Sequence, residues 1–357
     1  MITASDRFHA RATLAGVSES GILKAVQEGA EGGAVERAEG GWRVAHALGR
    51  IALRPQDSGF EILLEAEDRT SLAYLQLGLT YRLSTLNRRL QPDWESDNKP
   101  GMLLPYFREM RVVSVTDVTP RLRRVRLAGE DLARFARDGL HVRLLFPPEG
   151  AERPVWPRIG KNGDAVWPDD EDRPVARVYT IRRIDVARGL VDIDMVLHGG
   201  DDYPGAGWAA RAKPGDIVGM TGPGGGGAPK ARKLVLLGDE TALPAISRIL
   251  ENLPEEAEAV ARVEIADAAE IQPLETRAAL DFAWLPREGR PAGSTVLLPE
   301  ALKSLQLHGD DPDVFVWAGC EFSAFKTIRR HLRTALRLPR AQHLAVAYWR
   351  RGTVGAH

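Results

Sequence analysis

The 357-residue chain is predicted to contain three domains: an N-terminal α+β domain, an antiparallel β-barrel, and a C-terminal α/β domain with a mainly parallel sheet. Its length fits two or three domains of ordinary size. Strand patterns dominate the middle of the chain, whereas strands and helices alternate in its last third, which is typical of βαβ units. A polar stretch bounded by prolines, 91–100, ends the first block. We therefore place the domains at residues 1–97, 106–229 and 230–357.

The first block carries both strand and helix patterns. Residues 8–17 alternate as a strand does, and Ser18, a good helix cap, precedes a helix expected over 18–30. Leucines at helical spacing predict a longer helix over 68–90. Short strands are expected between the two helices, at 42–46, 50–54 and 60–65.

The second block is expected to be a small antiparallel barrel, because short strands are separated by glycine and proline. These strands are predicted at 110–118, 122–127, 141–146, 177–183 and 191–197. The segment 151–172, rich in proline, tryptophan and acids, is expected to be a long excursion from the barrel. The glycine-rich run 222–227 lacks the Lys-Ser/Thr of a phosphate loop, so we interpret it as a flexible junction to the third block.

The third block alternates strand and helix patterns, which predicts a mainly parallel sheet. Strands are expected at 233–238, 259–265, 281–285, 313–319 and 343–348. Helices are expected at 241–253, 299–307 and 323–336.

Composition excludes several functional classes. The net charge of -1 and the lack of Lys/Arg-rich runs argue against a nucleic-acid partner. A single cysteine, Cys320, cannot form an internal disulfide, an iron–sulfur cluster or a Cys-rich zinc site. Residues 1–11 lack the apolar region of a signal peptide, and no run approaches the roughly 18 apolar residues of a membrane span. We therefore expect a cytoplasmic protein.

The stretch 177–182 (RVYTIR) carries the groups that a flavin dinucleotide requires. Tyr179 is suited to stack on the ring and Thr180 to hydrogen-bond its edge. Arg177 or Arg182 is suited to neutralise phosphate bidentately. The alternative is an ordinary strand with two solvated arginines.

This stretch, together with 196–199 (VLHG) and 205–209 (GAGWA), resembles the FAD site of the siderophore-interacting proteins, a branch of the ferredoxin-reductase-like flavoproteins. Three further motifs follow in that family's order: 238–245 (GDETALPA), 317–321 (WAGCE) and 348–352 (YWRRG). The resemblance covers about residues 108–352. The first block instead resembles a small domain of unassigned function that is sometimes fused to this family.

The resemblance implies reduction of iron(III) held by a siderophore, with FAD as cofactor and NAD(P)H or ferredoxin as electron donor. Siderophores bind hard Fe(III) through oxygen ligands and hold Fe(II) less well, so one electron releases the metal. A flavin accepts the hydride pair and passes electrons on singly. Two alternatives fit the same motifs: a reductase of free flavin or of a partner protein, and a non-catalytic siderophore-binding protein.

Cofactor contacts are expected at residues that follow from these motifs. The backbone at Gly205 and Ala206 is suited to hold a pyrophosphate at a helix start, although many relatives carry a hydroxyl residue at Ala206. No catalytic acid or base is expected, since hydride transfer at a flavin does not require one. The full predicted set is Arg177, Tyr179, Thr180, Arg182, His198, Gly205, Ala206, Trp208, Ala209, Gly238, Glu240, Thr241, Ala242 and Glu321.

Several of these residues have simpler interpretations. His198 could merely cap a loop, and Asp239 or Thr241 could merely cap the following helix. Cys320 is placed either near the nicotinamide or in ordinary packing. Glu264 and Asp267 resemble acids that bind a ribose hydroxyl, but in a different dinucleotide fold.

An anionic siderophore complex is expected to bind a basic cleft near the flavin. The candidate cations follow the carboxyl ends of predicted strands, where ligands of parallel sheets bind. They are Arg287, Lys326, Arg350 and Arg351. The alternative is that each is an ordinary solvated surface residue.

Overall fold

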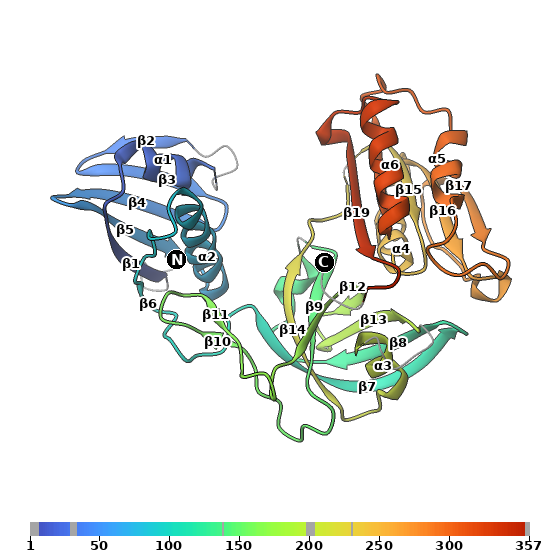
Figure 1. Cartoon of the computed structure of the whole chain (residues 1–357), viewed down its shortest axis with the longest axis horizontal. Helices are drawn as coiled ribbons and strands as arrows, with labels where there is room; N and C mark the ends of the chain where they lie inside the picture. Colours follow the sequence, from blue (N-terminus) through green and yellow to red (C-terminus); the bar gives the residue numbers. More distant parts are fainter. Residues whose placement is uncertain (1–6, 29–33, 138, 198–203, 230, 354–357) are drawn as a thin grey trace. The chain divides into compact units, whose positions relative to one another are not determined.

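The computed structural model describes residues 7–28, 34–137, 139–197, 204–229 and 231–353, which fold as two compact units (Figure 1). The first unit combines Met1–Phe107 with Ala151–Arg173. The second combines Arg108–Gly150 with Pro174–His357 and contains both the barrel and the parallel sheet.

The first unit is an antiparallel sheet covered by two helices. The strand order is β2-β3-β4-β5-β1-β6. The buried leucines of α2 pack against strand residues such as Ile51 and Ile62. Side-chain caps at Ser18 and Asp68 confirm the two predicted helix starts. The elements are β1 (Phe8–Ala15), α1 (Glu19–Gln27), β2 (Val35–Ala38), β3 (Gly41–His46), β4 (Gly49–Gln56), β5 (Gly59–Ala66), α2 (Arg69–Leu86) and β6 (Glu95–Ser96).

The excursion at 151–173 belongs to this first unit. Its Trp156 is buried and packs on Phe107, with ring centroids 5.2 Å apart. Gly101 donates a backbone hydrogen bond to Ile159 (2.8 Å). The segment contains the short hairpin of β10 (Arg158–Ile159) and β11 (Ala165–Val166).

A closed six-stranded barrel forms the first half of the second unit, in the order β12-β13-β8-β7-β14-β9. Its interior is packed with side chains such as Val125, Leu144 and Ile193. This barrel confirms the predicted fold class of the middle block. The strands are β7 (Phe107–Thr119), β8 (Leu122–Ala128), β9 (His141–Phe146), β12 (Val175–Asp185), β13 (Leu190–Val196) and β14 (Ile217–Gly224), and α3 (Pro204–Arg211) lies between the last two.

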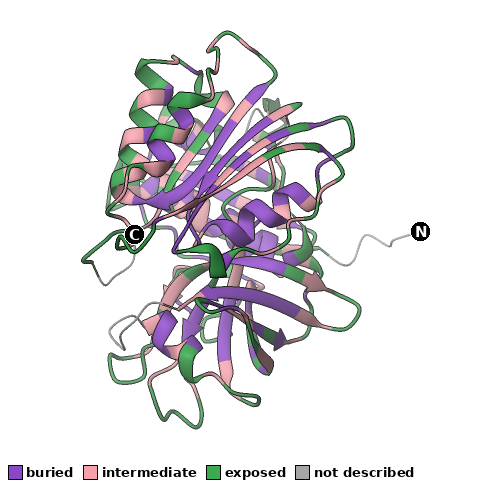
Figure 2. Cartoon of the chain, turned by 90° about the vertical axis from the view of Figure 1, so that its right-hand side faces the viewer, coloured by how far each residue is buried: buried purple, intermediate pink, exposed green. Residues whose placement is uncertain are grey.

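The second half is a five-stranded parallel sheet, ordered β17-β16-β15-β18-β19. Along β15, Leu234 and Leu236 face α4, whereas Val235 and Leu237 face α5 and α6, so both faces of the sheet are buried (Figure 2). The elements are β15 (Lys233–Gly238), α4 (Leu243–Glu251), β16 (Glu258–Ile265), β17 (Ala279–Pro286), α5 (Leu297–Ser304), β18 (Val314–Glu321), α6 (Phe322–Thr334) and β19 (His343–Trp349). Within the described ranges, no helix has the length and apolarity needed to cross a membrane.

Five strands were not expected: the two-residue strands β6, β10 and β11, and the longer strands β2 and β14. β2 was not expected, because its sequence (VERA) shows no apolar alternation. β14 extends into the glycine-rich run that we interpreted as a junction, since Gly222, Pro223 and Gly224 complete the strand. Local propensity does not favour a strand at these residues, and pairing with β9 stabilises it.

Candidate active site

The first half of β12 places Tyr179 beside the start of α3. The Tyr179 ring packs edge-on against Phe146, with centroids 6.0 Å apart. A Cβ atom built on Gly205 would lie 2.0 Å from the Tyr179 hydroxyl. Only glycine permits this approach, so the fold joins two motifs that are 26 residues apart in sequence.

The remainder of α3 anchors this contact. Trp208 also packs against the Phe146 ring, with centroids 5.0 Å apart, and Ala209 is fully buried. Ala206 is buried in the first turn. The helix N-terminus therefore lies beside Tyr179, and the free N–H groups at a helix start are suited to bind an anion. The predicted contact at His198 lies outside the described residues.

Arg177 is half-buried, and its guanidinium donates to the carbonyl oxygen of Ala176 (2.8 Å). No described carboxylate pairs with it, so this cation is available to a phosphate. Together with the Thr180 hydroxyl, the start of α3 and Tyr179, which is predicted to stack on the ring, it forms the donor set whose chemistry suits a phosphorylated flavin. Bound there, FAD would accept a hydride pair and deliver single electrons.

Thr180 is buried, and its hydroxyl lies 3.2 Å from Nδ1 of His141. His141 is the residue paired with Thr180 across β9 and β12. The other ring nitrogen, Nε2, lies 3.0 Å from the hydroxyl of Tyr348 on β19. Burial, reinforced by the nearby Arg248, lowers the pKa of His141 to about 4. The ring is therefore neutral at physiological pH.

Arg182, two residues further along β12, is buried and already paired. Its guanidinium donates to both oxygens of Glu251 on α4 (2.9 and 2.5 Å). A contact with the flavin would require this pair to open, and that role stays a prediction. In the structure, the pair joins the barrel to the α/β domain within the second unit.

The turn after β15 is organised by Asp239. Its carboxylate accepts from the backbone and hydroxyl of Thr241 (3.0 and 2.5 Å), the Glu321 backbone (3.1 Å) and the Trp349 indole (2.8 Å). Burial raises its pKa to about 6. Gly238 lies against Ala242, where a Cβ would be 2.7 Å from that side chain. The turn is therefore built for close packing of α4 on the sheet.

Glu240 and Arg287 form a buried bidentate pair (2.6 and 2.8 Å). Arg287 also lies 3.6 Å from Glu264, whose pKa is raised by burial. We expected Arg287 to face an anionic ligand, but it is only 3% exposed and neutralises two acids. Binding a chelate would require this pair to break.

The cavity at this edge of the sheet is small and acidic. It holds about 10 Å³, which is room for about one water. Asp239, Glu264 and Glu321 line it, with Arg287 as the cation. Cys320 also lines it but is fully buried, and burial raises the pKa of its thiol. That environment makes the thiol inert and supports the packing interpretation.

Three of the four expected cations gather at the start of α6. The Lys326 ammonium and the Arg350 guanidinium lie 5.6 and 4.9 Å from the ring centre of Phe322. The Arg351 backbone donates to Glu321 (3.2 Å), and Glu321 also caps α6 through the Ser323 backbone. All three cationic side chains are exposed.

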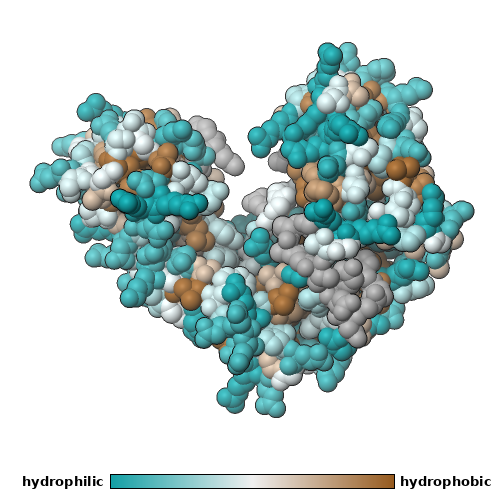
Figure 3. All heavy atoms as spheres, viewed as in Figure 1, coloured by the Kyte–Doolittle hydropathy of each residue, from teal (hydrophilic) through white to brown (hydrophobic). Residues whose placement is uncertain are grey.

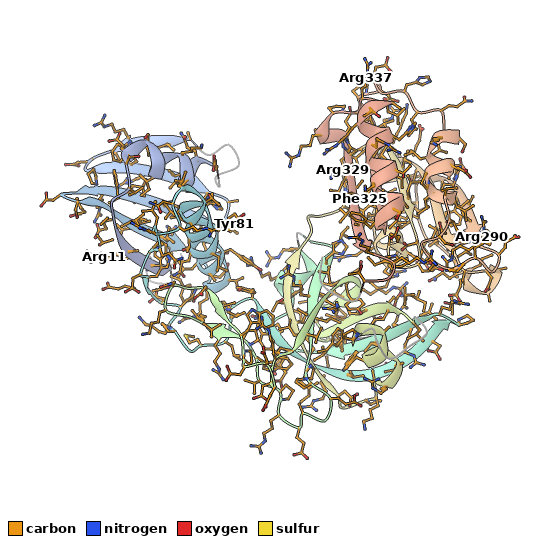
Figure 4. All side chains as sticks on the ribbon, viewed as in Figure 1. Arg11, Tyr81, Arg290, Phe325, Arg329 and Arg337 are labelled. Atoms are coloured by element: carbon orange, nitrogen blue, oxygen red, sulfur yellow. The ribbon has the colours of Figure 1, made fainter. Side chains whose placement is uncertain are left out.

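The remainder of α6 continues this basic surface. Figure 4 labels Phe325 and Arg329 on the helix, where the guanidinium lies 5.7 Å from the ring centre. Figure 3 shows the hydrophilic surface over the same helix. None of Lys326, Arg329, Arg330 and Arg333 has a carboxylate partner in the described part of the chain.

Sequence reasoning did not assign His141 to these sites. His141 stands at the polar start of a mostly apolar strand, and such a position signals a buried partner only once its neighbouring strand is known. The sequence does not show that β9 pairs with the Thr180 segment of β12.

Two models of known protein families match the regions of the chain that carry this site. A family model described as "Siderophore-interacting FAD-binding domain" matches residues 111–227. The chain is a flavin-dependent oxidoreductase, and its cofactor is FAD. A second model, "Siderophore-interacting protein", matches residues 231–352.

Individual relatives extend over both matched regions. The ferric vibriobactin reductase ViuB of Vibrio cholerae is 32% identical over 251 residues, 69% of this chain and 90% of that protein. The NADPH-dependent ferric-chelate reductase of Escherichia coli is 31% identical over 251 residues, 68% of this chain and 92% of that protein. A siderophore utilization protein from T. fusca is 38% identical and superposes with a TM-score of 0.62 over 72% of this chain and 98% of its own. The chain therefore belongs to the siderophore-interacting protein family.

Proposed function

We propose that this chain is a cytoplasmic ferric-siderophore reductase, which passes electrons from NAD(P)H or ferredoxin through FAD and releases the iron as Fe(II). The observation that carries the proposal is the contact of Tyr179 with Gly205, which joins β12 and the start of α3 into one donor set. The names of the Vibrio cholerae and Escherichia coli relatives support a ferric chelate as acceptor.

The proposed roles follow from charge and exposure. Arg177 and the α3 N-terminus would hold the FAD phosphates, with Tyr179 against the ring and Thr180 at its edge. The exposed cations Lys326, Arg350 and Arg351 would attract an anionic chelate. We leave Arg287 out of this site because Glu240 and Glu264 already neutralise it.

The charges at the edge of the sheet give less support to the proposed electron donor than to the other roles. Asp239, Glu240, Glu264 and Glu321 gather where a dinucleotide would meet the sheet, and they would repel its phosphates. An uncharged nicotinamide or ribose is better matched to that edge. The name of the Escherichia coli relative favours NADPH, with ferredoxin as the alternative.

Spectroscopy tests the proposal. Purified full-length protein should show flavin absorbance, which should bleach anaerobically with NADPH, NADH or reduced ferredoxin. A ferric siderophore should then restore the colour while a ferrous-iron indicator reports Fe(II). The proposal fails if no flavin can be loaded, or if free flavin reoxidises the protein and ferric chelates do not.

Substitution of the flavin site separates reduction from binding alone. Arg177→Ala combined with Tyr179→Ala should abolish flavin binding and iron reduction together. If the chain only sequesters siderophores, chelate binding should survive these substitutions and wild-type protein should yield no Fe(II).

A further inference from the structure

A hydrogen-bonded chain of three side chains crosses from the C-terminal strand to the proposed flavin site. It runs from the Tyr348 hydroxyl to Nε2 of His141 (3.0 Å) and from Nδ1 of His141 to the Thr180 hydroxyl (3.2 Å). The three residues lie on β19, β9 and β12 of the second unit. Neither His141 nor Tyr348 belongs to the flavin motif itself.

Close packing holds both rings in place. A Cβ on Gly225 would lie 2.3 Å from the His141 ring, and a Cβ on Gly319 would lie 3.0 Å from the Tyr348 ring. The two rings meet edge to face, with centroids 5.5 Å apart. His141 therefore has little freedom to turn away from either partner.

The protonation state of His141 decides which partner donates in each of its two hydrogen bonds. With a pKa near 4, the ring is neutral, so one nitrogen donates and the other accepts. A phenol is a stronger donor than an aliphatic hydroxyl, so the favoured arrangement has the Tyr348 O–H donating to Nε2. Nδ1–H must then donate to Thr180, which leaves the Thr180 O–H free.

We propose that His141 is a positioning residue, which is fixed in its Nδ1–H tautomer by Tyr348 and thereby directs the Thr180 hydroxyl proton toward the flavin edge. The proposal rests on the proposed function for the identity of that ligand. Oxidised flavin presents nitrogen acceptors at its edge, and a free Thr180 O–H can donate to them. In the opposite tautomer, the Thr180 proton would be held by Nδ1, and its oxygen could only accept.

The tautomer is measured first, on full-length protein with the flavin removed, by long-range ¹H–¹⁵N NMR of the imidazole nitrogens. Wild-type His141 should show protonated Nδ1 and unprotonated Nε2. Tyr348→Phe should shift the ring toward the Nε2–H form, which is the commoner form of free neutral histidine. Tyr81→Phe, which alters an exposed tyrosine on α2, is the matched control and should change nothing (Figure 4). A wild-type Nε2–H form, or a tautomer unaffected by Tyr348→Phe, overturns the proposal.

The flavin-loaded protein supplies the second readout. In Tyr348→Phe, the Thr180 hydroxyl no longer donates to the oxidised flavin. The midpoint potential of the flavin should therefore move to a more positive value. In a Thr180→Val background, the same substitution should leave the potential unchanged, since the hydroxyl that carries the effect is gone. An equal shift in both backgrounds overturns the proposed route through Thr180. Failure to load any flavin would refute the proposed function while leaving the tautomer result standing.

Discussion

Burial acts in opposite directions on Asp239 and His141. It favours the protonated form of the acid, whose pKa rises to about 6, and the neutral form of the base, whose pKa falls to about 4. Between pH 4 and pH 6.5, ionisation of Asp239 therefore lowers the free energy of unfolding as the pH rises. Protonation of His141 lowers it as the pH falls. The two contributions offset each other, so only variants can separate them.

For Asp239, the unfolded chain ionises near pH 3.8 and the folded protein near pH 6. Below pH 4, the protonated form of Asp239 stabilises the folded protein by about 3 kcal/mol, and this contribution is lost by pH 6. Asp239→Asn should remove this loss and leave the opposite contribution of His141, so its free energy of unfolding should rise between pH 4 and pH 6.5 relative to that of wild type. Urea unfolding across this range measures the slope. The surface variant Glu256→Gln should keep the wild-type slope, and equal slopes for Asp239→Asn and wild type would contradict the assignment.

Gly205 and Tyr179 provide a second prediction at the scale of single residues. Gly205→Ala places a methyl group against the Tyr179 hydroxyl, and such overpacking costs about 1–3 kcal/mol. FAD affinity should fall by about tenfold or more, because the donor set is displaced. Thermal and urea unfolding, with FAD titration by fluorescence, measure both effects.

Removing the hydroxyl should relieve that clash. Tyr179→Phe in the Gly205→Ala background should recover most of the lost stability, since the next ring atom is 3.2 Å from the added methyl. Gly227→Ala, with no atom within 4 Å of the new Cβ, is the control. A Gly205→Ala protein as stable as wild type would show that α3 does not approach Tyr179.

At the scale of elements, the pair between Arg182 on β12 and Glu251 on α4 connects the barrel to the α/β domain. Glu251→Gln removes the bidentate partner of a buried guanidinium and leaves it only Asp194, 3.9 Å away, so it should cost about 3 kcal/mol. Asp281→Asn breaks the exposed pair with Arg262 and should cost at most about 1 kcal/mol. Urea unfolding compares the two variants, and equal losses would contradict a structural role for the Arg182 pair.

The exposed cations at the start of α6 should steer an anionic chelate. Lys326→Gln combined with Arg350→Gln should raise KM for the ferric siderophore by about tenfold and weaken its dependence on salt. Reduction of the flavin by the donor should keep its wild-type rate. Arg333→Gln, in the last turn of the same helix, serves as the control. If both substitutions raise KM equally, the effect comes from net charge and not from a site.

At the scale of the whole molecule, the chain passes between the two units three times, at 107–108, 150–151 and 173–174. Phe146 pairs with Val175 where β9 and β12 meet, so the excursion is an enlarged hairpin loop whose ends lie together. The first unit contributes Phe107 and Gly101 to hold Trp156 and Ile159 of that loop. The first unit is therefore completed by residues from the middle of the sequence.

This arrangement predicts how the protein tolerates truncation. Deletion of residues 1–106 alone should give aggregated protein, because it exposes the buried Trp156 and Ile159. Deletion of 1–106 together with replacement of 151–173 by a short turn should give soluble protein that binds FAD. Size-exclusion chromatography and flavin content measure the outcome. Equal solubility of both truncations would show that the loop does not depend on the first unit.

The order and type of most elements follow from local pattern. The strand at 233–238 was predicted with the bounds that the structure gives, because a run buried on both faces is uniformly apolar. β14 was missed, because glycine and proline disfavour strands and this strand is ordered by pairing with its neighbours in the barrel, β7 and β9. The helix start at Asp68 could be read from its capping side chain, which is a local signal.

By itself, the sequence determined the three kinds of fold and the resemblance that nominated Arg177, Tyr179 and Thr180, since strand alternation, helix spacing and short motifs are local properties. The tertiary structure decided which charges remain available. Among the residues that the structure describes, no acid pairs with Arg177, whereas Arg182 and Arg287 are neutralised by acids 69 and 47 residues distant in sequence. It also decided that His141 lies between Thr180 and Tyr348. Such pairings depend on which strands become neighbours, and that is settled by burying the core as a whole.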